Sequence, residues 1–248
     1  MNLLVDIGNS RIKWSGQTAG GLDGLRAAQY SKANVYECLD AHWETLAKPQ
    51  AVWLANVAGK AVAEQLARWT VTHWNLEPQF AQVSRTAGEV RNGYADSNQL
   101  GIDRWLALIA TWQKYKTAAC IVDCGTAVTI DGLDATGRHL GGLILPGVPM
   151  MQQALSQTAA GIPVIDTAQV VKGLAVNTGQ GVINGCTMAV VTLIEHTVDM
   201  LRTAVTGKLN CVITGGGAGN ILPLLKSGFM HEPQLVLEGL GIVASNKS

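Results

Sequence analysis

The pattern of hydrophobic and polar positions along the chain predicts an alternation of short buried strands and longer helices. Brief apolar runs are bounded by glycine, asparagine or small polar residues, which is typical of strands that end at tight turns. This alternation predicts an α/β fold. We expect strands at residues 3–5, 12–14, 51–57, 120–123, 128–131, 141–147, 211–214 and 234–237.

The clearest helix is predicted to begin at Asp103. Apolar side chains recur there at Trp105, Leu108, Ile109 and Trp112, a spacing that places them on one helical face. An acid at the start of a helix is also favoured as a cap, so Asp103 alone has a purely structural interpretation. Further helices are expected at residues 60–69 and 181–205, and a polar loop at residues 84–99.

One short motif occurs twice. Asp6-Ile7-Gly8-Asn9-Ser10 and Asp123-Cys124-Gly125-Thr126-Ala127 each follow an apolar run and place an acid, a glycine and small polar residues at a turn. The glycine allows a ligand to approach the backbone, the N–H and hydroxyl groups can bind phosphate oxygens, and the aspartate can hold a cation. A single Asp-Gly turn is ordinary turn chemistry. Its duplication after matching strands favours a nucleotide held between two related halves, residues 1–116 and 117–248.

Composition and charge narrow the function classes. The net charge of zero argues against broad electrostatic binding to nucleic acid or to an anionic membrane. The chain has no run of about 18 apolar residues, and its first residues lack the features of a signal peptide. An odd number of cysteines without a CxxC pair favours reduced thiols, with Cys120 and Cys124 as small core residues. We therefore expect a cytoplasmic protein with no nucleic-acid and no membrane partner.

Several common site motifs are absent from the sequence. It has no GxxxxGK[ST] loop, no strand-associated GxGxxG with its acidic partner, no HExxH or Cys/His cluster, and no serine elbow. The remaining candidates are the two Asp-x-Gly turns, the pair Asp103-Arg104, and a glycine-rich loop at residues 215–219. Arg104 could form a surface ion pair, and the glycine-rich loop could be only a loop. Its place after a buried strand suits close approach to a base or ribose.

Taken together, four motifs resemble the type III pantothenate kinase family over nearly the whole chain. They are Asp6-x-Gly8-Asn9-Ser10, Gly101-Ile102-Asp103-Arg104-Trp105, Asp123-x-Gly125-Thr126-Ala127 and Thr214-Gly215-Gly216-Gly217-Ala218. The Asp-x-Gly turns alone are shared with acetate and sugar kinases, hsp70 and actin. The resemblance implies two ribonuclease H-like domains, each a mixed five-stranded sheet flanked by helices, with ATP in the cleft between them.

The resemblance also implies an activity. The family phosphorylates pantothenate from ATP, the first step of coenzyme A biosynthesis, with Mg²⁺ and a monovalent cation, K⁺ or NH₄⁺, and acts as a homodimer. The apolar segment 181–205 suits a dimer interface and a buried core helix equally well. Two alternatives stay open: an accessory or regulatory relative of the family, and a kinase of the same superfamily that acts on another hydroxyl or carboxylate substrate.

Site residues follow from the same resemblance. Asp103 is implied as the proton acceptor, Asp123 as the monovalent-cation ligand, and Asp6 as a Mg²⁺ ligand that acts through water. The implied ATP contacts are Asp6, Ile7, Gly8, Asn9, Ser10, Arg11, Ile12, Lys13, Thr126, Gly215 and Gly216, with the loop through Ala218 beside the adenosine. The implied pantothenate contacts are Tyr94, Gly101, Ile102, Asp103, Arg104 and, across the dimer, Thr178.

The sequence departs from the family pattern at two positions. Ser10 stands where the family usually has threonine, which keeps the hydroxyl group. Ser97 stands where a proline is common before the Gly-x-Asp-Arg element, so a looser loop is expected there without loss of a functional group.

Overall fold

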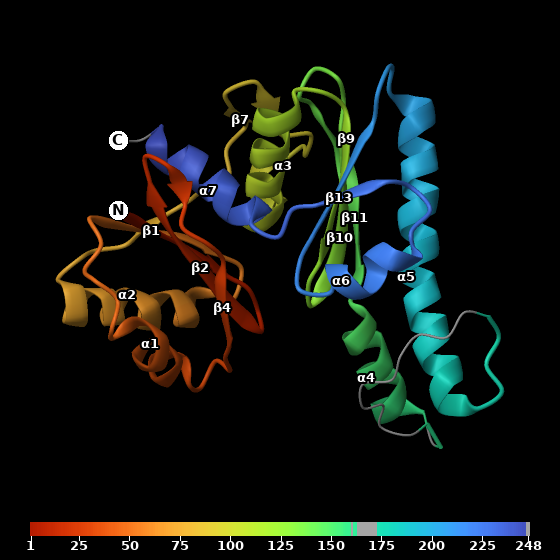
Figure 1. The fold of residues 1–248 in the computed structure, drawn as a ribbon, viewed down its shortest axis with the longest axis horizontal. Helices are drawn as coiled ribbons and strands as arrows, with labels where there is room; N and C mark the ends of the chain where they lie inside the picture. Colours follow the sequence, from red (N-terminus) through yellow and green to blue (C-terminus); the bar gives the residue numbers. More distant parts are fainter. Residues whose placement is uncertain (160, 163–172, 247–248) are drawn as a thin grey trace. The chain divides into compact units, whose positions relative to one another are not determined.

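A computed structural model describes residues 1–159, 161–162 and 173–246. The chain divides into two compact units, of which the first comprises Met1–Tyr115 and Gln234–Ser248 and the second Lys116–Pro233. Each unit is a mixed sheet with helices, in agreement with the predicted α/β class (Figure 1). The expected boundary after residue 116 lies one residue from this division, but residues 234–246 pack with the first unit and not with the second.

The first unit is built on a six-stranded sheet in the order β3-β2-β1-β5-β6, with β4 paired to β2, one strand more than the five expected. β1 is antiparallel to β2 and parallel to β5. All but one of the residues of β1 are buried, because helices cover both faces of the sheet. The strands are β1 (Asn2–Ile7), β2 (Arg11–Thr18), β3 (Gly21–Leu22), β4 (Arg26–Gln29), β5 (Ala51–Asn56) and β6 (Gln79–Phe80).

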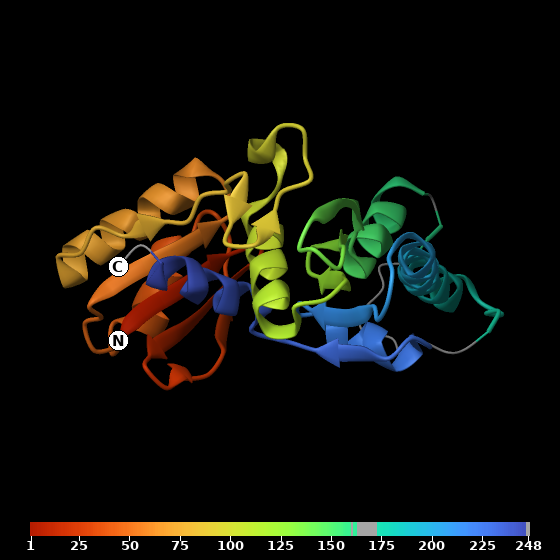
Figure 2. The same cartoon turned by 90° about the horizontal axis from the view of Figure 1, so that it is seen from above.

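Helices α1 (Val35–Trp43) and α2 (Lys60–Trp74) cover one face of this sheet. Their side chains form one apolar core with alternate residues of β1, and it includes three tryptophans, Trp43, Trp69 and Trp74, in mutual ring contact. Helix α3 (Ile102–Tyr115) begins one residue before the predicted start. It packs on the other side of the sheet, as Figure 2 shows from above.

The segment predicted as a strand at residues 234–237 is instead the first turn of helix α7 (Leu235–Ser245). A short apolar run does not by itself distinguish a buried strand from a buried helix, which is why the prediction was wrong. The helix packs closely on α3 because Gly239 has no side chain: a Cβ there would overlap the Leu106 carbonyl group. Tertiary packing against α3 and β1 therefore determines the conformation of this segment.

The second unit repeats the topology of the first. Its five-stranded sheet has the order β11-β10-β9-β12-β13, with β9 antiparallel to β10 and parallel to β12, as β1 is to β2 and β5. The matched sheets explain why the Asp-x-Gly motif occurs twice, each time between the first strand and its antiparallel neighbour. The strands are β9 (Ala119–Cys124), β10 (Ala127–Leu133), β11 (His139–Pro146), β12 (Asn210–Thr214) and β13 (Phe229–His231).

Helix α5 (Thr178–Ala204) is the long apolar helix expected at residues 181–205. By length and composition it could cross a membrane, but 56% of its most apolar window is buried inside the structure. Val190, Ile194 and Val198 pack against the second sheet together with Cys120 and Cys124. The apolar character of the buried face is thus that of a core helix, and the two cysteines are core residues as predicted.

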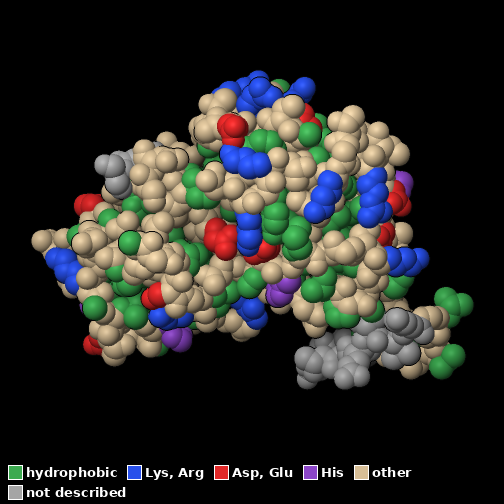
Figure 3. Space-filling model, turned by 45° about the horizontal axis from the view of Figure 1, so that its top comes forward, with side chains coloured by type: hydrophobic (Ala, Val, Ile, Leu, Met, Phe, Trp, Pro, Cys, Tyr) green, Lys and Arg blue, Asp and Glu red, His purple; other side chains and the backbone are tan. Residues whose placement is uncertain are grey.

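The remaining described elements are short. Helix α4 (Val148–Thr158) packs along α5, and α6 (Ala218–Ile221) with the 3₁₀ turn η2 (Leu222–Leu224) follows β12. The loop expected at residues 84–99 contains a small hairpin, β7 (Thr86–Ala87) with β8 (Val90–Arg91), and the 3₁₀ turn η1 (Ser97–Gln99). On the face drawn in Figure 3, basic and acidic side chains are interspersed among neutral ones.

Candidate functional site

The first Asp-x-Gly turn joins β1 to β2. Ile7 and Ile12 are the last paired residues, and the Gly8 N–H donates to the Arg11 carbonyl over 3.0 Å to close the turn. Asp6 is 7% exposed and faces Lys13 across the two strands, with 3.8 Å between Nζ and the carboxylate. This cation offsets part of the cost of burying the carboxylate. The turn thus holds one acid and one base beside exposed backbone.

Tyr30 forms hydrogen bonds that stabilise this first turn, although it belongs to none of the sequence motifs. Its hydroxyl donates to the Gly8 carbonyl over 2.6 Å, and its N–H donates to the Ser10 carbonyl over 3.2 Å. Burial raises the pKa of the Tyr30 phenol, so it stays a neutral donor. On the other side, the Val57 N–H donates to the Ile7 carbonyl over 3.0 Å. The conformation of the turn is therefore fixed from both flanks.

The second turn joins β9 to β10 and is one residue shorter. Cys124 and Val128 are its last paired residues, so three residues lie between them where the first turn has four. The Gly125 N–H donates to the Ala127 carbonyl over 3.0 Å. Asp123 pairs with Thr129 in the register, the position that Lys13 occupies in the first turn. The two turns share a backbone plan but differ in the residue paired with the aspartate, which is lysine in the first turn and threonine in the second.

Two glycines of the second unit form backbone hydrogen bonds with this second turn. The Gly217 N–H donates to the Cys124 carbonyl over 2.8 Å, and the Gly147 N–H donates to the Thr126 carbonyl over 2.9 Å. Gly215 has a φ of +92°, and a Cβ there would overlap the Asp123 carboxylate. These glycines permit close packing of the protein on itself. Gly216 lies exposed between its neighbours, at the tip of the loop.

Tyr94 and Arg104 meet in the first unit. The Arg104 Nη1 donates to the Tyr94 hydroxyl over 3.0 Å, and its Cζ lies 5.6 Å from the centre of the Tyr94 ring. Arg104 is only 6% exposed, so it does not lie on the surface, where the structural interpretation of the sequence had placed it. A guanidinium group can recognise a carboxylate or phosphate, which makes this pair a candidate for binding an anionic or polar ligand.

Asp103 lies in the first turn of α3, next to this pair. Its Oδ1 accepts from the Arg104 N–H over 2.8 Å, so the side chain binds a backbone N–H in the first turn of the helix, a structural role of the kind that the sequence left open. Gly101 leaves room for it, because a Cβ there would come within 2.6 Å of the same oxygen. A half-buried carboxylate beside a buried arginine can bind a hydroxyl group and accept its proton.

The loop that carries Tyr94 is ordered by polar contacts. Arg85 Nη1 donates to the Tyr94 carbonyl over 2.6 Å, and the Asn92 side-chain oxygen accepts from the Tyr94 N–H over 3.0 Å. Ser97, where a looser loop was expected, begins η1, and its carbonyl accepts from Asn92 Nδ2 over 3.2 Å. The turn dipeptide Asn92-Gly93 is a sequence signal that could have located this turn, although none of the predictions rested on it.

Thr178 is the first residue of α5 and is exposed. It belongs to the second unit, whereas Tyr94 and Arg104 belong to the first. It lies at one end of a groove of about 870 Å³ between α4 and α5, whose other lining residues include Met150, Leu155 and Val182. The groove is mostly apolar.

Among the described residues, no group of three or more His, Cys, Asp or Glu side chains could hold a metal ion by itself. Asp6 and Asp123 each offer a single carboxylate at a turn with exposed backbone. A hard cation prefers several oxygen ligands, so single carboxylates of this kind suit a cation that is also bound by phosphate oxygens or water. The donor set therefore fits a metal–nucleotide complex better than a resident metal.

Comparisons with known proteins agree with the motifs. Residues 2–200 match the family model described as type III pantothenate kinase. A protein of that name from Nitrosococcus oceani is 42% identical over 100% of this chain and 95% of its own length. A Campylobacter jejuni structure titled a putative Baf family transcriptional activator has a TM-score of 0.62 at 21% identity, over 99% of this chain and 98% of that one. A putative 2-dehydro-3-deoxygalactonokinase from Sinorhizobium meliloti has a TM-score of 0.57 at 13% identity, over 100% and 99%.

Proposed function

Because this chain belongs to the type III pantothenate kinase family, we propose that it transfers the γ-phosphoryl group of ATP to the primary hydroxyl of pantothenate. The products are ADP and 4'-phosphopantothenate, and the reaction is the first step of coenzyme A biosynthesis. Within the structure, the proposal rests mainly on the contact between the buried Arg104 and Tyr94 beside Asp103. In addition, the first strand of each sheet is followed by an Asp-x-Gly turn.

The phosphates of ATP are assigned to the two Asp-x-Gly turns. In the first turn the residues from Asp6 to Lys13 offer backbone donors, the Ser10 hydroxyl and the Lys13 ammonium group. In the second unit Thr126 binds phosphate, and Gly215 and Gly216 lie beside the adenosine. Lys13 is paired with Asp6, so this site offers both a cation for phosphate and a carboxylate for a metal.

Two cations complete the nucleotide site. A bound Mg²⁺ would supply positive charge that offsets the negative charge developing on the phosphate oxygens during phosphoryl transfer. Asp6 holds it, through water. Asp123 holds a monovalent cation, K⁺ or NH₄⁺, at the second turn, where Thr129 occupies the register position that Lys13 holds opposite Asp6. The different neighbours of the two aspartates support this division of roles.

Pantothenate binds to Tyr94 and to the start of α3, residues 101–104. Arg104 pairs with the pantothenate carboxylate or with developing charge, since its fixed donors suit oxygen anions. Asp103 accepts the proton of the primary hydroxyl as it attacks the γ-phosphate. General-base assistance of this kind contributes about 10²–10⁴ in rate. The transition state for phosphoryl transfer is loose, so a weak carboxylate base is sufficient.

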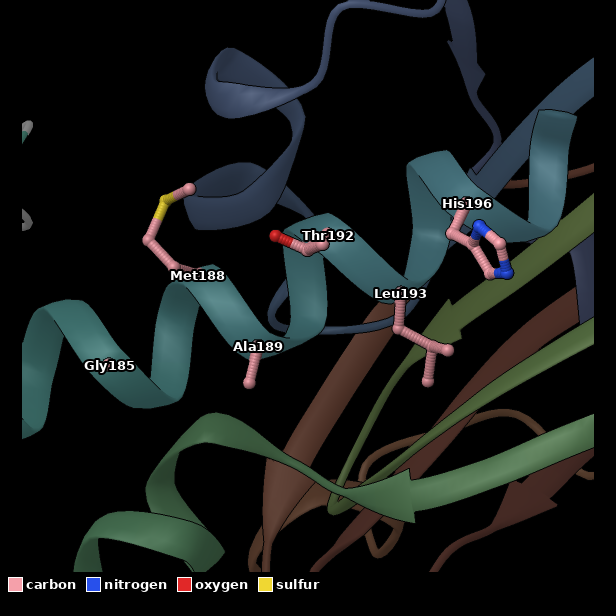
Figure 4. Close-up of a pocket in the computed structure, with 6 residues that line it drawn as sticks. All are labelled: Gly185, Met188, Ala189, Thr192, Leu193 and His196. Atoms are coloured by element: carbon pink, nitrogen blue, oxygen red, sulfur yellow. The ribbon is translucent and has the colours of Figure 1, made fainter.

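The proposal includes a homodimer, with the exposed face of α5 as part of its interface. Met188, Thr192, His196 and Met200 recur every fourth residue and are all exposed, so they form one ridge of the helix. Figure 4 shows the first three projecting from one side of α5. Exposed methionines on a packed core helix are typical of a surface that a partner covers. In this dimer Thr178 is assigned to the pantothenate site of the second copy.

The two alternatives make different predictions. A regulatory relative could keep the nucleotide turns without the base, but Asp6, Asp103 and Asp123 are all present. Another small-molecule kinase of the superfamily would use the same turns with a different acceptor. The interspersed charges in Figure 3 and the net charge of zero favour a cytoplasmic enzyme over a nucleic-acid-binding protein.

The test is ADP release from Mg·ATP upon addition of pantothenate, first with K⁺ and then with Na⁺ in its place. Turnover that depends on pantothenate and falls without K⁺ supports both the kinase and the cation role of Asp123. A panel of other hydroxyl and carboxylate substrates under the same conditions separates the related kinases. Folded protein that binds ATP but turns over none of these acceptors favours the regulatory relative.

A further inference from the structure

We propose that Arg85 and Asn92 are positioning residues that set the affinity for the acceptor substrate by holding Tyr94 against Arg104. The proposal rests on the assignment of Tyr94 and Arg104 to the pantothenate site. Neither residue belongs to the motifs that identify the family in this sequence. Both act on the backbone of Tyr94, from opposite sides of the loop.

Arg85 ties the loop from the outside. Its Nη1 donates to the Tyr94 carbonyl over 2.6 Å and to the Ala95 carbonyl over 3.3 Å. One guanidinium group thereby holds two successive peptide units, which fixes the direction of the chain as it leaves Tyr94. Hydrogen bonds from a charged donor are about twice as strong as neutral ones.

Asn92 ties the loop from the inside. It is only 4% exposed, and its carboxamide bridges the loop: the oxygen accepts from the Tyr94 N–H, and Nδ2 donates to the Ser97 carbonyl. Its own N–H donates to the Arg85 carbonyl over 3.0 Å. The two residues are thus joined to each other as well as to Tyr94.

Polar contacts have to do this work because the loop has no apolar anchor. Between Val90 and Leu100, which are both buried, Asn92 is the one buried residue. A segment that buries no hydrophobic side chain gains little from packing, so its conformation depends on its hydrogen bonds. Arg85 and Asn92 supply those that reach Tyr94 itself.

The consequence reaches the ligand through one side chain. The backbone of Tyr94 is fixed by Arg85 and Asn92, and the Tyr94 hydroxyl accepts from Arg104, whose own position is fixed by α3. Releasing the backbone lets the ring leave the guanidinium group, which reduces the fraction of molecules with a formed acceptor site. Apparent affinity falls by that fraction, while bound substrate reacts as before.

The experiment compares Arg85→Ala, Arg85→Lys and Asn92→Ala in the full chain, with Arg68→Ala on α2 as an exposed arginine control. We expect the pantothenate KM to rise about tenfold for Arg85→Ala and Asn92→Ala, the size of about one net hydrogen bond. The ATP KM and kcat should change less than about twofold on the same scale. Arg85→Lys should recover part of the affinity, since an ammonium group can still donate to a carbonyl.

A double-mutant cycle tests the route through Tyr94. If Arg85 acts through the ring, Arg85→Ala should add little to the pantothenate KM of Tyr94→Ala. Full additivity would overturn the proposal, as would equal changes in the pantothenate and ATP KM values. Normal pantothenate KM values for Arg85→Ala and Asn92→Ala, with raised values for Tyr94→Ala and Arg104→Ala, would overturn this proposal alone. Normal values for all four would overturn the assignment of the site itself. Thermal unfolding identifies any variant that fails to fold. If an alanine variant does not fold, the pantothenate KM of Arg85→Lys, a change at an exposed position, is used in its place.

Discussion

Arg104 and Tyr94 are joined by a hydrogen bond of 3.0 Å and by a cation–π contact of 5.6 Å, and the arginine is nearly buried in doing so. Two contacts of different kind to one ring fix the plane of the guanidinium group, because the hydroxyl and the ring face constrain different directions. The guanidinium donors then point in defined directions. An arginine held in this way is suited to select an acceptor by shape as well as by charge.

This geometry predicts that Arg104→Lys is not conservative. Lysine keeps the charge but loses the planar fork and the ring contact, so kcat/KM for pantothenate should fall by about 10–100-fold, or 1.4–2.7 kcal/mol. ATP binding, measured by calorimetry without pantothenate, should be unchanged. A lysine variant with normal kcat/KM would show that only the charge of Arg104 matters.

Asp103→Asn should abolish most turnover while ATP binding is retained. Asparagine keeps the side-chain oxygen that accepts from the Arg104 N–H, so the start of α3 should hold. It cannot take the proton of the acceptor hydroxyl, and kcat should fall by about 10²–10⁴. Single-turnover kinetics at saturating ATP and pantothenate measure this directly. Near-normal kcat in the folded variant would remove the base assignment and leave Asp103 as a helix-terminal acid.

Tyr30→Phe should weaken ATP binding with little effect on pantothenate. The substitution removes the 2.6 Å hydrogen bond to the Gly8 carbonyl and preserves the ring in the core. The protein should lose about 1 kcal/mol of unfolding free energy, and the ATP KM should rise several-fold because the phosphate turn is less well fixed. Denaturant unfolding and initial rates check the two effects. Tyr36→Phe, at an exposed tyrosine on α1, is the matched control.

Cys124 should resist thiol reagents although it lies beside a proposed phosphate turn. Burial raises its pKa to about 12, and because only the thiolate reacts, about one molecule in 10⁴ is reactive at pH 8. The rate of labelling should increase about tenfold for each unit by which the pH is raised, as long as the pH stays below that pKa. Mass spectrometry after iodoacetamide treatment should find label on the half-buried Cys38 first. Rapid labelling of Cys124 that ATP prevents would contradict this expectation.

The sequence predicted the strands and turns well because those signals are local. An apolar run followed by Asp-x-Gly contains its own strand and its own turn, and the helix from Asp103 contains its own apolar face. Helix α7 could not be predicted in this way, because its conformation depends on contact with Leu106, far away in the chain. The supports of Tyr94 were missed for a related reason: an arginine that binds two carbonyls leaves no pattern in composition or periodicity.

The return of the last helix to the first unit makes the second unit an insertion within the first. The polypeptide leaves the first unit after Tyr115 and returns to it at Gln234. The face of α3 that packs against Gly239 therefore stays exposed until α7 has been synthesised. During translation the first unit therefore waits, incomplete, while the second can already fold. The first unit is the first to be synthesised and the last to be completed. A ribosome that stalls before residue 234 therefore leaves the core of this unit exposed on one side.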